Sequence, residues 1–205
     1  MCVKRGIGYG ISMAFLATAF LGACVGCGGD RPATAPAASA PAVASPRTES
    51  PTVSIRLVDH AEVEAERAKH LGKVVVLDCW STSCPPCVKE FPGLVKLQEA
   101  FGDRVACLSL SFDYEGIGSP DEVVPRVEGF LREVGAGKIV NLVAREDADA
   151  LSKKMDLVSV PAVFVWKPDG TLARKFDDDM ASKELGRPFT YEDITAAVEA
   201  CLAVE

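Results

Sequence analysis

Two cysteines three residues apart are the feature of this sequence with the clearest chemistry. Cys84 and Cys87 lie in the segment DCWSTSCPPC, residues 78–87, directly after an unbroken apolar run at residues 74–77. Pro85 is favourable at the first position of a helix, where its missing N–H would have no partner. Cys84 would then stand at the helix N-terminus, where unpaired N–H groups and the helix dipole favour a thiolate, the nucleophile of disulfide exchange.

Cys87 gives this nucleophile a partner. It follows Cys84 by three residues and so falls on the same face of the first helical turn, where the two sulfurs can form a disulfide. One cysteine can therefore attack a disulfide in another protein, and the other can release the mixed disulfide that results. The pair predicts a thiol-disulfide exchange site. The alternatives are an inert structural disulfide and one half of a zinc site.

A zinc site is disfavoured by the positions of the other candidate ligands. Tetrahedral zinc needs two more ligands at suitable spacing. The other CxxC, residues 24–27, lies beyond a spacer rich in Pro, Ala, Ser and Thr. His60 and His70 are on a polar helical stretch without metal-ligand spacing. We therefore expect no metal and no other cofactor.

The cysteine pair must be positioned by a fold in which strands and helices alternate. Apolar runs predict strands at residues 53–58, 74–77, 105–112, 139–143, 162–166 and 171–176. Helical spacing predicts helices at residues 59–71, 121–134, 147–155 and 191–202, and residues 167–170 (KPDG) predict a hairpin turn. This alternation favours a central sheet with helices on both faces.

Four features in order resemble the thioredoxin superfamily. They are the pattern Asp78-x-Trp80-x-x-x-Cys84-x-x-Cys87, Pro92 five residues later, Val160-Pro161 before an apolar strand, and the KPDG turn. The extra strand and helix between residues 105 and 155 resemble the TlpA/ResA subgroup of bacterial envelope thiol-disulfide oxidoreductases. The resemblance implies an α/β thioredoxin fold: a central mixed sheet flanked by helices on both faces, with an inserted strand and helix before a cis-proline loop.

The resemblance also implies catalytic roles. Cys84 would be the attacking thiol and Cys87 the resolving thiol of a redox-active disulfide. Asp78 matches the buried acid that exchanges a proton with the resolving cysteine in thioredoxins. Burial would raise the pKa of this carboxyl and suit it to proton transfer near neutral pH.

A substrate-binding set follows from the same resemblance. Pro161, in a cis peptide bond, would leave the backbone of Val160 free to pair with an extended substrate. Trp80 is a candidate substrate contact, although packing beneath the active-site loop is the favoured interpretation. Two positions depart from the family pattern: Ser83 stands where a tryptophan is usual, and three aspartates at residues 177–179 stand near a usual glycine. A solvated turn is the expectation for those aspartates.

The N-terminus has the pattern of an export signal. Lys4 and Arg5 precede an uncharged run at residues 7–21, which is short for a transmembrane span. The following LGAC resembles the lipobox of bacterial lipoproteins, which implies cleavage before Cys24 and its lipidation. An ordinary signal peptide or an uncleaved anchor is the alternative. Residues 30–51 contain 17 Pro, Ala, Ser or Thr among 22 and predict a flexible spacer.

These segments predict a domain organisation and a location. We expect a lipoprotein-type signal peptide at residues 1–23, a tether at 24–52 and a thioredoxin-like domain at 53–205. The domain would be lipid-anchored in the bacterial cell envelope and face the periplasm or the exterior. Its expected partners are cysteine-containing exported proteins and an upstream redox partner such as a membrane electron carrier. With 29 acidic and 22 basic residues, the net charge of −7 disfavours nucleic acid as a partner.

Two other functions remain open from the sequence. Peroxiredoxins share this fold, but their PxxxTxxC pattern is not matched, because Leu77 and Ser81 replace its Pro and Thr. The third class is a non-enzymatic thioredoxin-like binding module whose disulfide only holds the loop. Cys79, Cys107 and Cys201 are expected to pack in the core as small hydrophobic residues.

Overall fold

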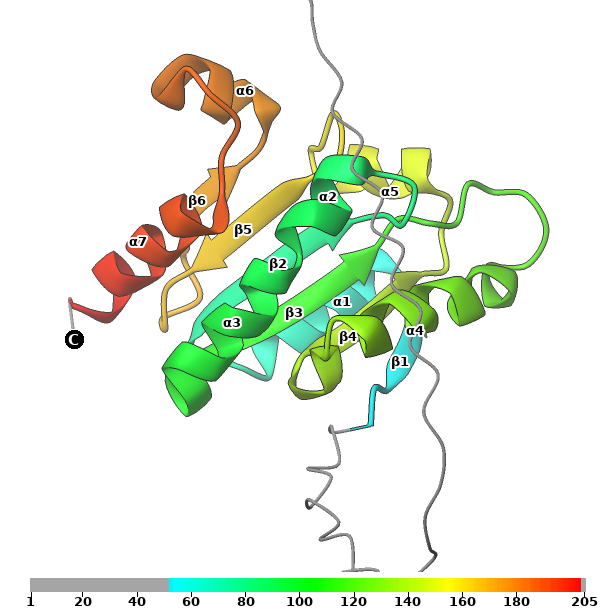
Figure 1. Ribbon diagram of the computed structural model, residues 1–205, viewed down its shortest axis with the longest axis horizontal. Coiled ribbons are helices and arrows are strands. Elements are labelled where there is room, and N and C mark those ends of the chain that lie inside the picture. The colour runs from blue at the N-terminus through cyan, green and yellow to red at the C-terminus, as the bar shows by residue number, and fades with distance from the viewer. Residues whose placement is uncertain (1–51, 204–205) are drawn as a thin grey trace, which may run out of the picture. The chain divides into compact units, whose positions relative to one another are not determined.

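A six-stranded mixed sheet forms the centre of the computed structural model, which describes residues 52–203 (Figure 1). The predicted signal peptide, Cys24 and the predicted spacer up to residue 51 lie outside these residues. The strands are β1 (Ile55–Val58), β2 (Val74–Trp80), β3 (Val105–Ser111), β4 (Val140–Ala144), β5 (Ala162–Trp166) and β6 (Leu172–Phe176). Their order is β1-β4-β3-β2-β5-β6. Strands β1, β4 and β3 run parallel to β2, and β5 is antiparallel to both of its neighbours, β2 and β6.

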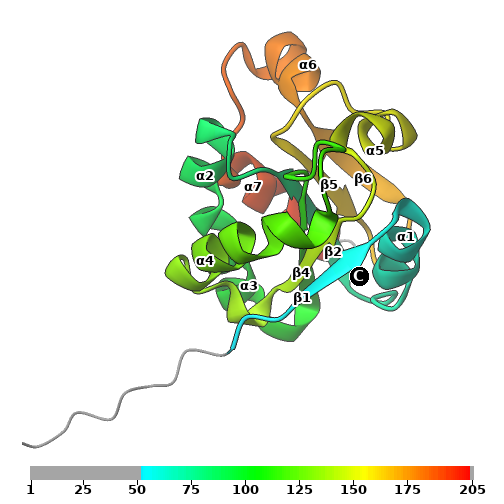
Figure 2. The same cartoon turned by 90° about the vertical axis from the view of Figure 1, so that its right-hand side faces the viewer.

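Helices cover both faces of this sheet, as predicted (Figure 2). One face carries α1 (His60–Ala68) and α5 (Ala148–Lys154). The other carries α2 (Pro85–Glu90), α3 (Pro92–Phe101), α4 (Val124–Glu133) and α7 (Tyr191–Leu202). None of the helices within residues 52–203 is long and apolar enough to cross a membrane.

Strand β2 is buried along its whole length between β3 and β5. Alternate residues point to opposite faces of a sheet. Val76 and Trp80 accordingly join the core under α2, α3 and α7, whereas Val75 and Leu77 join the core under α1 and α5. Burial on both faces explains the unbroken apolar run. It also fixes the position of the loop that follows the carboxyl end of β2.

The inserted elements predicted before the cis-proline loop are present. Strand β4 lies between β1 and β3, and α4 connects β3 to it. The predicted helix at residues 121–134 begins differently, because Pro120–Val123 form a 3₁₀ turn and α4 starts only at Val124. Pro125 is in the first turn of α4, where a missing N–H is tolerated. Helix α1 begins as predicted after Asp59, which forms a capping box with Glu62, but it ends at Ala68.

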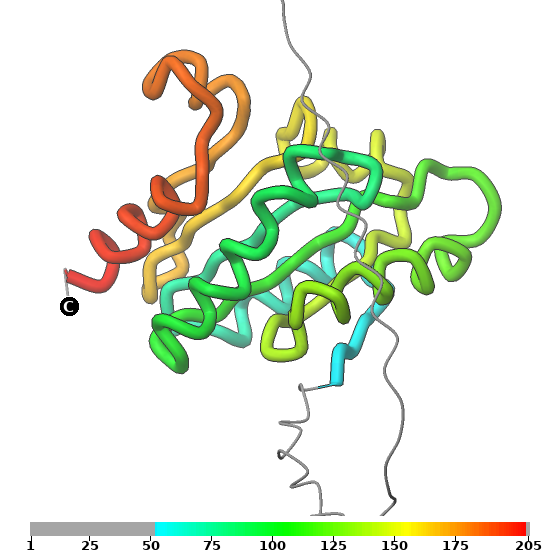
Figure 3. Tube along the Cα trace, viewed as in Figure 1, coloured from blue at the N-terminus to red at the C-terminus, as the bar shows by residue number. Residues whose placement is uncertain are grey.

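The three aspartates after β6 correct a prediction. They do not form a simple solvated turn, because residues 178–180 form the short helix α6 (Asp178–Met180), which continues into a π-helical turn, Ala181–Leu185. Asp177 caps α6, since its carboxylate accepts a hydrogen bond from the N–H of Met180 at 2.8 Å. Figure 3 shows this segment extending beyond the end of β6 before the chain returns into α7.

Candidate functional site

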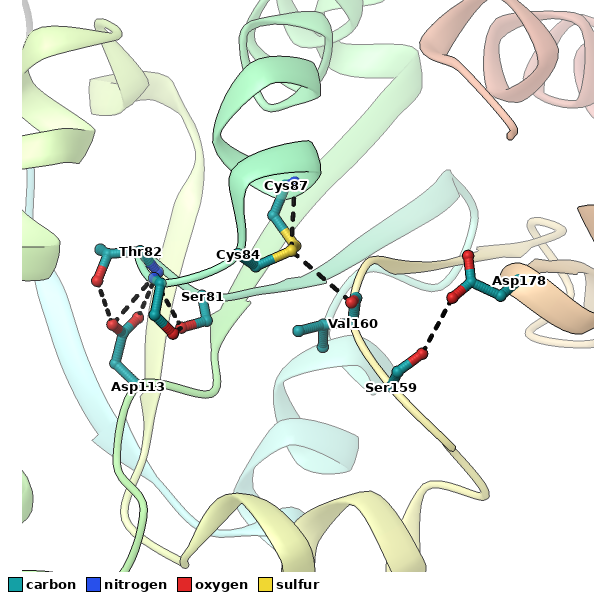
Figure 4. The surroundings of a disulfide bond; sticks show 9 residues. Ser81, Thr82, Cys84, Cys87, Asp113, Ser159, Val160 and Asp178 are labelled. Carbon is teal, nitrogen blue, oxygen red and sulfur yellow. Dashed lines mark hydrogen bonds between the residues drawn. A yellow bond between two sulfur atoms is a disulfide. The ribbon is translucent and has the colours of Figure 1, made fainter. Parts of the chain in front are cut away.

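Cys84 and Cys87 form a disulfide at the start of α2, with 5.3 Å between their Cα atoms (Figure 4). Cys84 is the N-cap of α2, and the N–H of Cys87 donates to its sulfur at 3.3 Å. Pro85 occupies the first helical position, as predicted. Cys84 is partly exposed while Cys87 is 3% exposed, so a partner protein can reach the first sulfur and not the second.

The helix that carries the pair is interrupted at Pro92, one of the residues of the family pattern. α2 ends at Glu90 and α3 begins at Pro92. Proline has no N–H for the carbonyl four residues earlier, which breaks the helical hydrogen-bond series at this point. The pair therefore sits on a short helical segment whose far end is fixed by Phe91 in the core.

The loop before β5 faces the disulfide. The Val160–Pro161 peptide bond is cis, as predicted. The carbonyl oxygen of Val160 lies 3.7 Å from the Cys84 sulfur (Figure 4). While Cys84 is in the disulfide, its sulfur has no proton to donate to this oxygen. In the reduced protein, the Cys84 thiol can donate a hydrogen bond to it. Val158, two residues before, is 99% exposed, which leaves the approach to this loop open.

Asp78 is buried on β2, two residues before Trp80. Its side chain is on the face of the sheet that packs against α2, α3 and α7, in the same core as Cys87. Burial raises the pKa of this carboxyl to about 7, and a hydrogen bond from the hydroxyl of Tyr191 opposes the rise. The direction agrees with the prediction made from burial, and the value places the group where it can change charge near neutral pH.

Tyr191 is a residue that sequence reasoning missed. It is the first residue of α7, more than a hundred positions after Asp78 in the chain. The available signal was its place at the start of an amphipathic helix, which does not tell which strand the ring will meet.

A second buried carboxyl, Asp113, was also missed. It lies two residues after the end of β3, at the same end of the sheet as the active-site loop. Its oxygens accept from the backbone N–H of Thr82 at 3.0 and 3.2 Å and from the Thr82 hydroxyl. Ser111 and Arg126 donate to it at 2.7 and 2.9 Å. The signal was a charged residue shortly after a buried strand. Asp113 fixes the loop two residues before Cys84 (Figure 4).

Trp80 requires a correction as a candidate substrate contact. Its side chain is fully buried and packs against Phe91 and Phe130, with ring centroids 4.7 and 4.9 Å away. A residue without exposed surface cannot touch a partner protein, so packing under the active-site loop is its role. Ser83, at the position where the family usually has tryptophan, is exposed and bonds to Ser81.

The remaining cysteines of the described chain are free and buried, which confirms the packing prediction for Cys79, Cys107 and Cys201. Burial raises the pKa of all three thiols. They stay protonated near neutral pH and are poor nucleophiles. Within residues 52–203, no cluster of three or more His, Cys, Asp or Glu side chains is arranged to hold a metal ion.

A groove in the described residues is separate from the disulfide. It has a volume of about 770 Å³ and lies between α3 and α7, where Gly93, Leu97 and Tyr191 contribute to its wall. Neither cysteine of the pair lines it. Disulfide exchange needs an accessible sulfur and not an enclosed cavity, so the groove does not define the chemistry.

Comparison with known proteins agrees with this architecture. No family model matches the chain. The thioredoxin-like protein YneN of Bacillus subtilis (strain 168) is 33% identical over 114 residues, which are 56% of this chain and 62% of YneN. The matched part of the chain thus spans about three fifths of the length of this curated relative.

Two solved structures also resemble it. A thiol:disulfide interchange protein of the thioredoxin family from Chlorobium tepidum TLS is 18% identical, over 66% of this chain and 83% of that one, with a TM-score of 0.49. A secreted Mycobacterium tuberculosis disulfide oxidoreductase homologous to E. coli DsbE is 19% identical, over 65% and 85% of the two chains, with a TM-score of 0.49. The sheet order of this chain and its sequence similarity to YneN both agree with a thioredoxin-like fold.

Proposed function

We propose that this protein is a thiol-disulfide oxidoreductase that exchanges disulfides with exported proteins through Cys84 and Cys87. The observation that carries the proposal is the disulfide itself: one sulfur is accessible, caps a helix and lies 3.7 Å from the Val160 carbonyl. A purely structural bridge would gain nothing from an exposed sulfur at a helix N-terminus.

The two cysteines have different roles in this proposal. After reduction, a Cys84 thiolate would accept the Cys87 N–H that now points at its sulfur. A hydrogen bond to the charged form favours that form, so Cys84 is the attacking group. Cys87 is shielded from partners and bonds to the Cys84 sulfur beside it, which suits it to resolve the mixed disulfide.

The Val160 backbone would hold the client. Its carbonyl faces the reacting sulfur, and the peptide bond that follows it is cis. An extended segment of a client protein can therefore pair with this loop while its own sulfur approaches Cys84. The exposed Val158 beside the loop offers apolar surface to the same segment.

The location belongs to the same proposal. A lipid on Cys24, at the end of an export signal, would tether the domain to the bacterial cell envelope, outside the cytoplasm. Its clients would be exported proteins with cysteines, and an upstream redox partner, such as a membrane electron carrier, would recycle the pair. Metabolic labelling with a radioactive fatty acid tests this: label is expected on the full chain and absent from Cys24→Ala, with Cys27→Ala as the matched control.

The activity is tested with the full chain and a disulfide substrate. Wild type is expected to reduce insulin with dithiothreitol as the electron source, and Cys84→Ser is expected to lose at least about a hundredfold in rate. Cys87→Ser should instead accumulate a mixed disulfide at Cys84, because the resolving thiol is gone. Cys201→Ser removes a buried free thiol and should retain the wild-type rate.

Two outcomes would exclude the proposal in favour of its alternatives. Insulin reduction by wild type no faster than that by Cys84→Ser and by the buffer alone would mean that the pair is structural and the domain a binding module. Rapid consumption of hydrogen peroxide by the reduced chain, without insulin reduction, would indicate a peroxidase of the peroxiredoxin type.

A further inference from the structure

Tyr191 is the point at which α7 meets the buried acid of β2. Its hydroxyl donates to Oδ2 of Asp78, and both side chains are buried. Within residues 52–203, no lysine or arginine forms an ion pair with Asp78. The carboxylate, which burial disfavours, therefore depends on a neutral hydroxyl as its donor.

The tyrosine ring is held tightly in place. A Cβ atom added to Gly93 of α3 would lie 2.2 to 2.5 Å from atoms of the Tyr191 side chain, so only glycine lets α3 approach this closely. The start of α7 is fixed as well, because Asp193 accepts from the Thr190 N–H at 2.9 Å and from Arg187 at 2.7 and 2.8 Å. The direction of the hydroxyl is thus set by packing on one side and by the helix start on the other.

We propose that Tyr191 is a positioning residue that orients the Asp78 carboxyl in the core shared with Cys87 and stabilises its ionised form, so that it can accept the Cys87 proton. This inference rests on the proposed function. Burial raises the pKa of the carboxyl, and the hydrogen bond from Tyr191 lowers it against that effect. The balance puts the pKa at about 7.

The step served by this pair is the release of a client. The Cys87 thiol passes its proton to the Asp78 carboxylate, and the Cys87 sulfur forms a bond to the Cys84 sulfur. The bond between Cys84 and the client sulfur breaks, and the client leaves as a thiolate with the electron pair. Over both steps, the two protein thiols are oxidised to a disulfide and the client disulfide is reduced to two thiols.

Other titratable groups around the pair do not replace Tyr191. The buried thiols Cys79 and Cys107 have raised pKa values and remain neutral where Asp78 titrates. The negative charge of Glu90 raises the pKa of Tyr191 further, after burial and Asp78, so the phenol stays protonated and can donate. Cys107 of β3 and Glu90 of α2 raise the pKa of Tyr191, and Lys175 of β6 lowers the pKa of Cys79, the neighbour of Asp78 on β2.

The test uses Tyr191→Phe in the full chain. The reduced protein is mixed with oxidised glutathione, quenched with acid, and analysed by mass spectrometry for the mixed disulfide on Cys84. Loss of the donor should raise the pKa of Asp78 by about one unit, so resolution should slow about fivefold near pH 7. The rate should return to the wild-type value above about pH 9, where the carboxyl is ionised in both proteins.

A second substitution strengthens the hydrogen bond to Asp78 instead of removing it. Fluorotyrosine in place of Tyr191 keeps the ring and makes its hydroxyl a stronger donor. Resolution should then be faster than in wild type below about pH 7, because the pKa of Asp78 falls. This protein keeps the packing against Gly93, so it gives an answer even if Tyr191→Phe folds poorly.

Two controls distinguish positioning from a general structural effect. Tyr114→Phe removes a hydroxyl that donates to Gly118 at the exposed loop after β3 and should leave the pH profile unchanged. Tyr191→Phe added to Asp78→Asn should slow resolution no further than Asp78→Asn alone. Equal slowing at every pH, or additive slowing in the double variant, would overturn the inference.

Failure of the proposed function has a different signature. If wild-type protein forms no mixed disulfide with glutathione, the oxidoreductase proposal fails and this inference fails with it. If wild type completes the cycle while Tyr191→Phe has the wild-type profile, the inference alone is wrong.

Discussion

Asp78 and Asp113 are both buried carboxyl groups beside the active-site loop, but their partners differ. Asp113 accepts from Thr82, Ser111 and Arg126 and is held at the end of β3. For Asp78, the donor among residues 52–203 is the hydroxyl of Tyr191, without a cation. One carboxylate is surrounded by donors and the other has a single neutral one.

The difference indicates how one fold uses two buried acids. Several donors compensate for lost hydration and hold a carboxyl group in place, so the group serves as a fixed anchor. A single neutral donor compensates only in part, so the group can gain and lose a proton near pH 7. Asp113 therefore holds the loop that carries Cys84, and Asp78 is available for proton transfer.

The largest effect that can test this contrast is on stability at Asp113. Asp113→Ala leaves the Thr82 N–H and hydroxyl and the Ser111 hydroxyl without their acceptor. We expect the free energy of unfolding to fall by about 3–5 kcal/mol, because buried donors are left unpaired. Urea denaturation of the oxidised protein measures the loss.

Asp103→Ala is the matched control, because Asp103 is exposed and its removal should change stability by less than about 0.5 kcal/mol. A loss at Asp113 as small as in this control would mean that the carboxylate is not an anchor. The contrast with Asp78 would then have no basis.

Asp78 should make the free energy of unfolding depend on pH. Its pKa is about 7 in the folded protein against an ordinary value of 3.8. Between these values the folded state binds more protons than the unfolded state, so the free energy of unfolding falls as pH rises and levels off above about 7. The decline is roughly 4 kcal/mol at most, at about 1.4 kcal/mol for each pKa unit.

Asp78→Asn removes this decline, since an amide has no charge to bury. Near pH 4 the two proteins should have similar stability, and near pH 8 the variant should be the more stable one. Urea titrations across this range supply the measurement. Parallel profiles of wild type and variant would show that Asp78 does not titrate as its burial indicates.

Much of the fold could be predicted because its signals are local. The two-sided apolar run of β2 and the amphipathic pattern of α7 correspond to elements whose bounds are close to those observed. Asp59 marks a helix start through its side-chain carboxylate, and Pro85 marks one through its missing N–H. The segment after β6 was not foreseen, because three adjacent aspartates fit either a solvated turn or a helix N-terminus, and the capping bond of Asp177 decides between them.

Local motifs also predicted part of the site, but they did not predict contacts between residues far apart in the sequence. The cysteine pair and the Val160–Pro161 loop follow from motifs, and the burial of Asp78 follows from its place in a central strand. Tyr191 and Asp113 could not be found, because their roles come from contacts across the fold. Trp80 illustrates a different limit. It is close to the cysteine pair in the sequence and belongs to the motif, but its side chain is wholly buried, which the motif does not reveal.

Thr82→Val tests whether the anchor acts through the loop. The substitution keeps the shape of the side chain and removes its hydroxyl bond to Asp113, while the backbone bond at 3.0 Å remains. We expect a loss of about 1–2 kcal/mol in stability. Thr171→Val, which removes a hydroxyl bond to the exposed Asp169 in the hairpin, should lose less. Equal losses in the two variants would show that burial of the acceptor is unimportant.

The smallest effect is expected at Arg126, the one cation that pairs with Asp113 in the described chain. Its side chain is 57% exposed while that of Asp113 is 0% exposed, so the ion pair is screened on one side. Arg126→Met keeps most of the apolar stem and should reduce stability by about 1 kcal/mol or less, with weak dependence on salt. Denaturation at low and high salt provides the measurement. A loss as large as that of Asp113→Ala would mean that the cation, and not the neutral donors of the loop and β3, holds this side chain in place. Asp78 would then differ from Asp113 in lacking a cation, and adding donors around Asp78 would not convert it into an anchor.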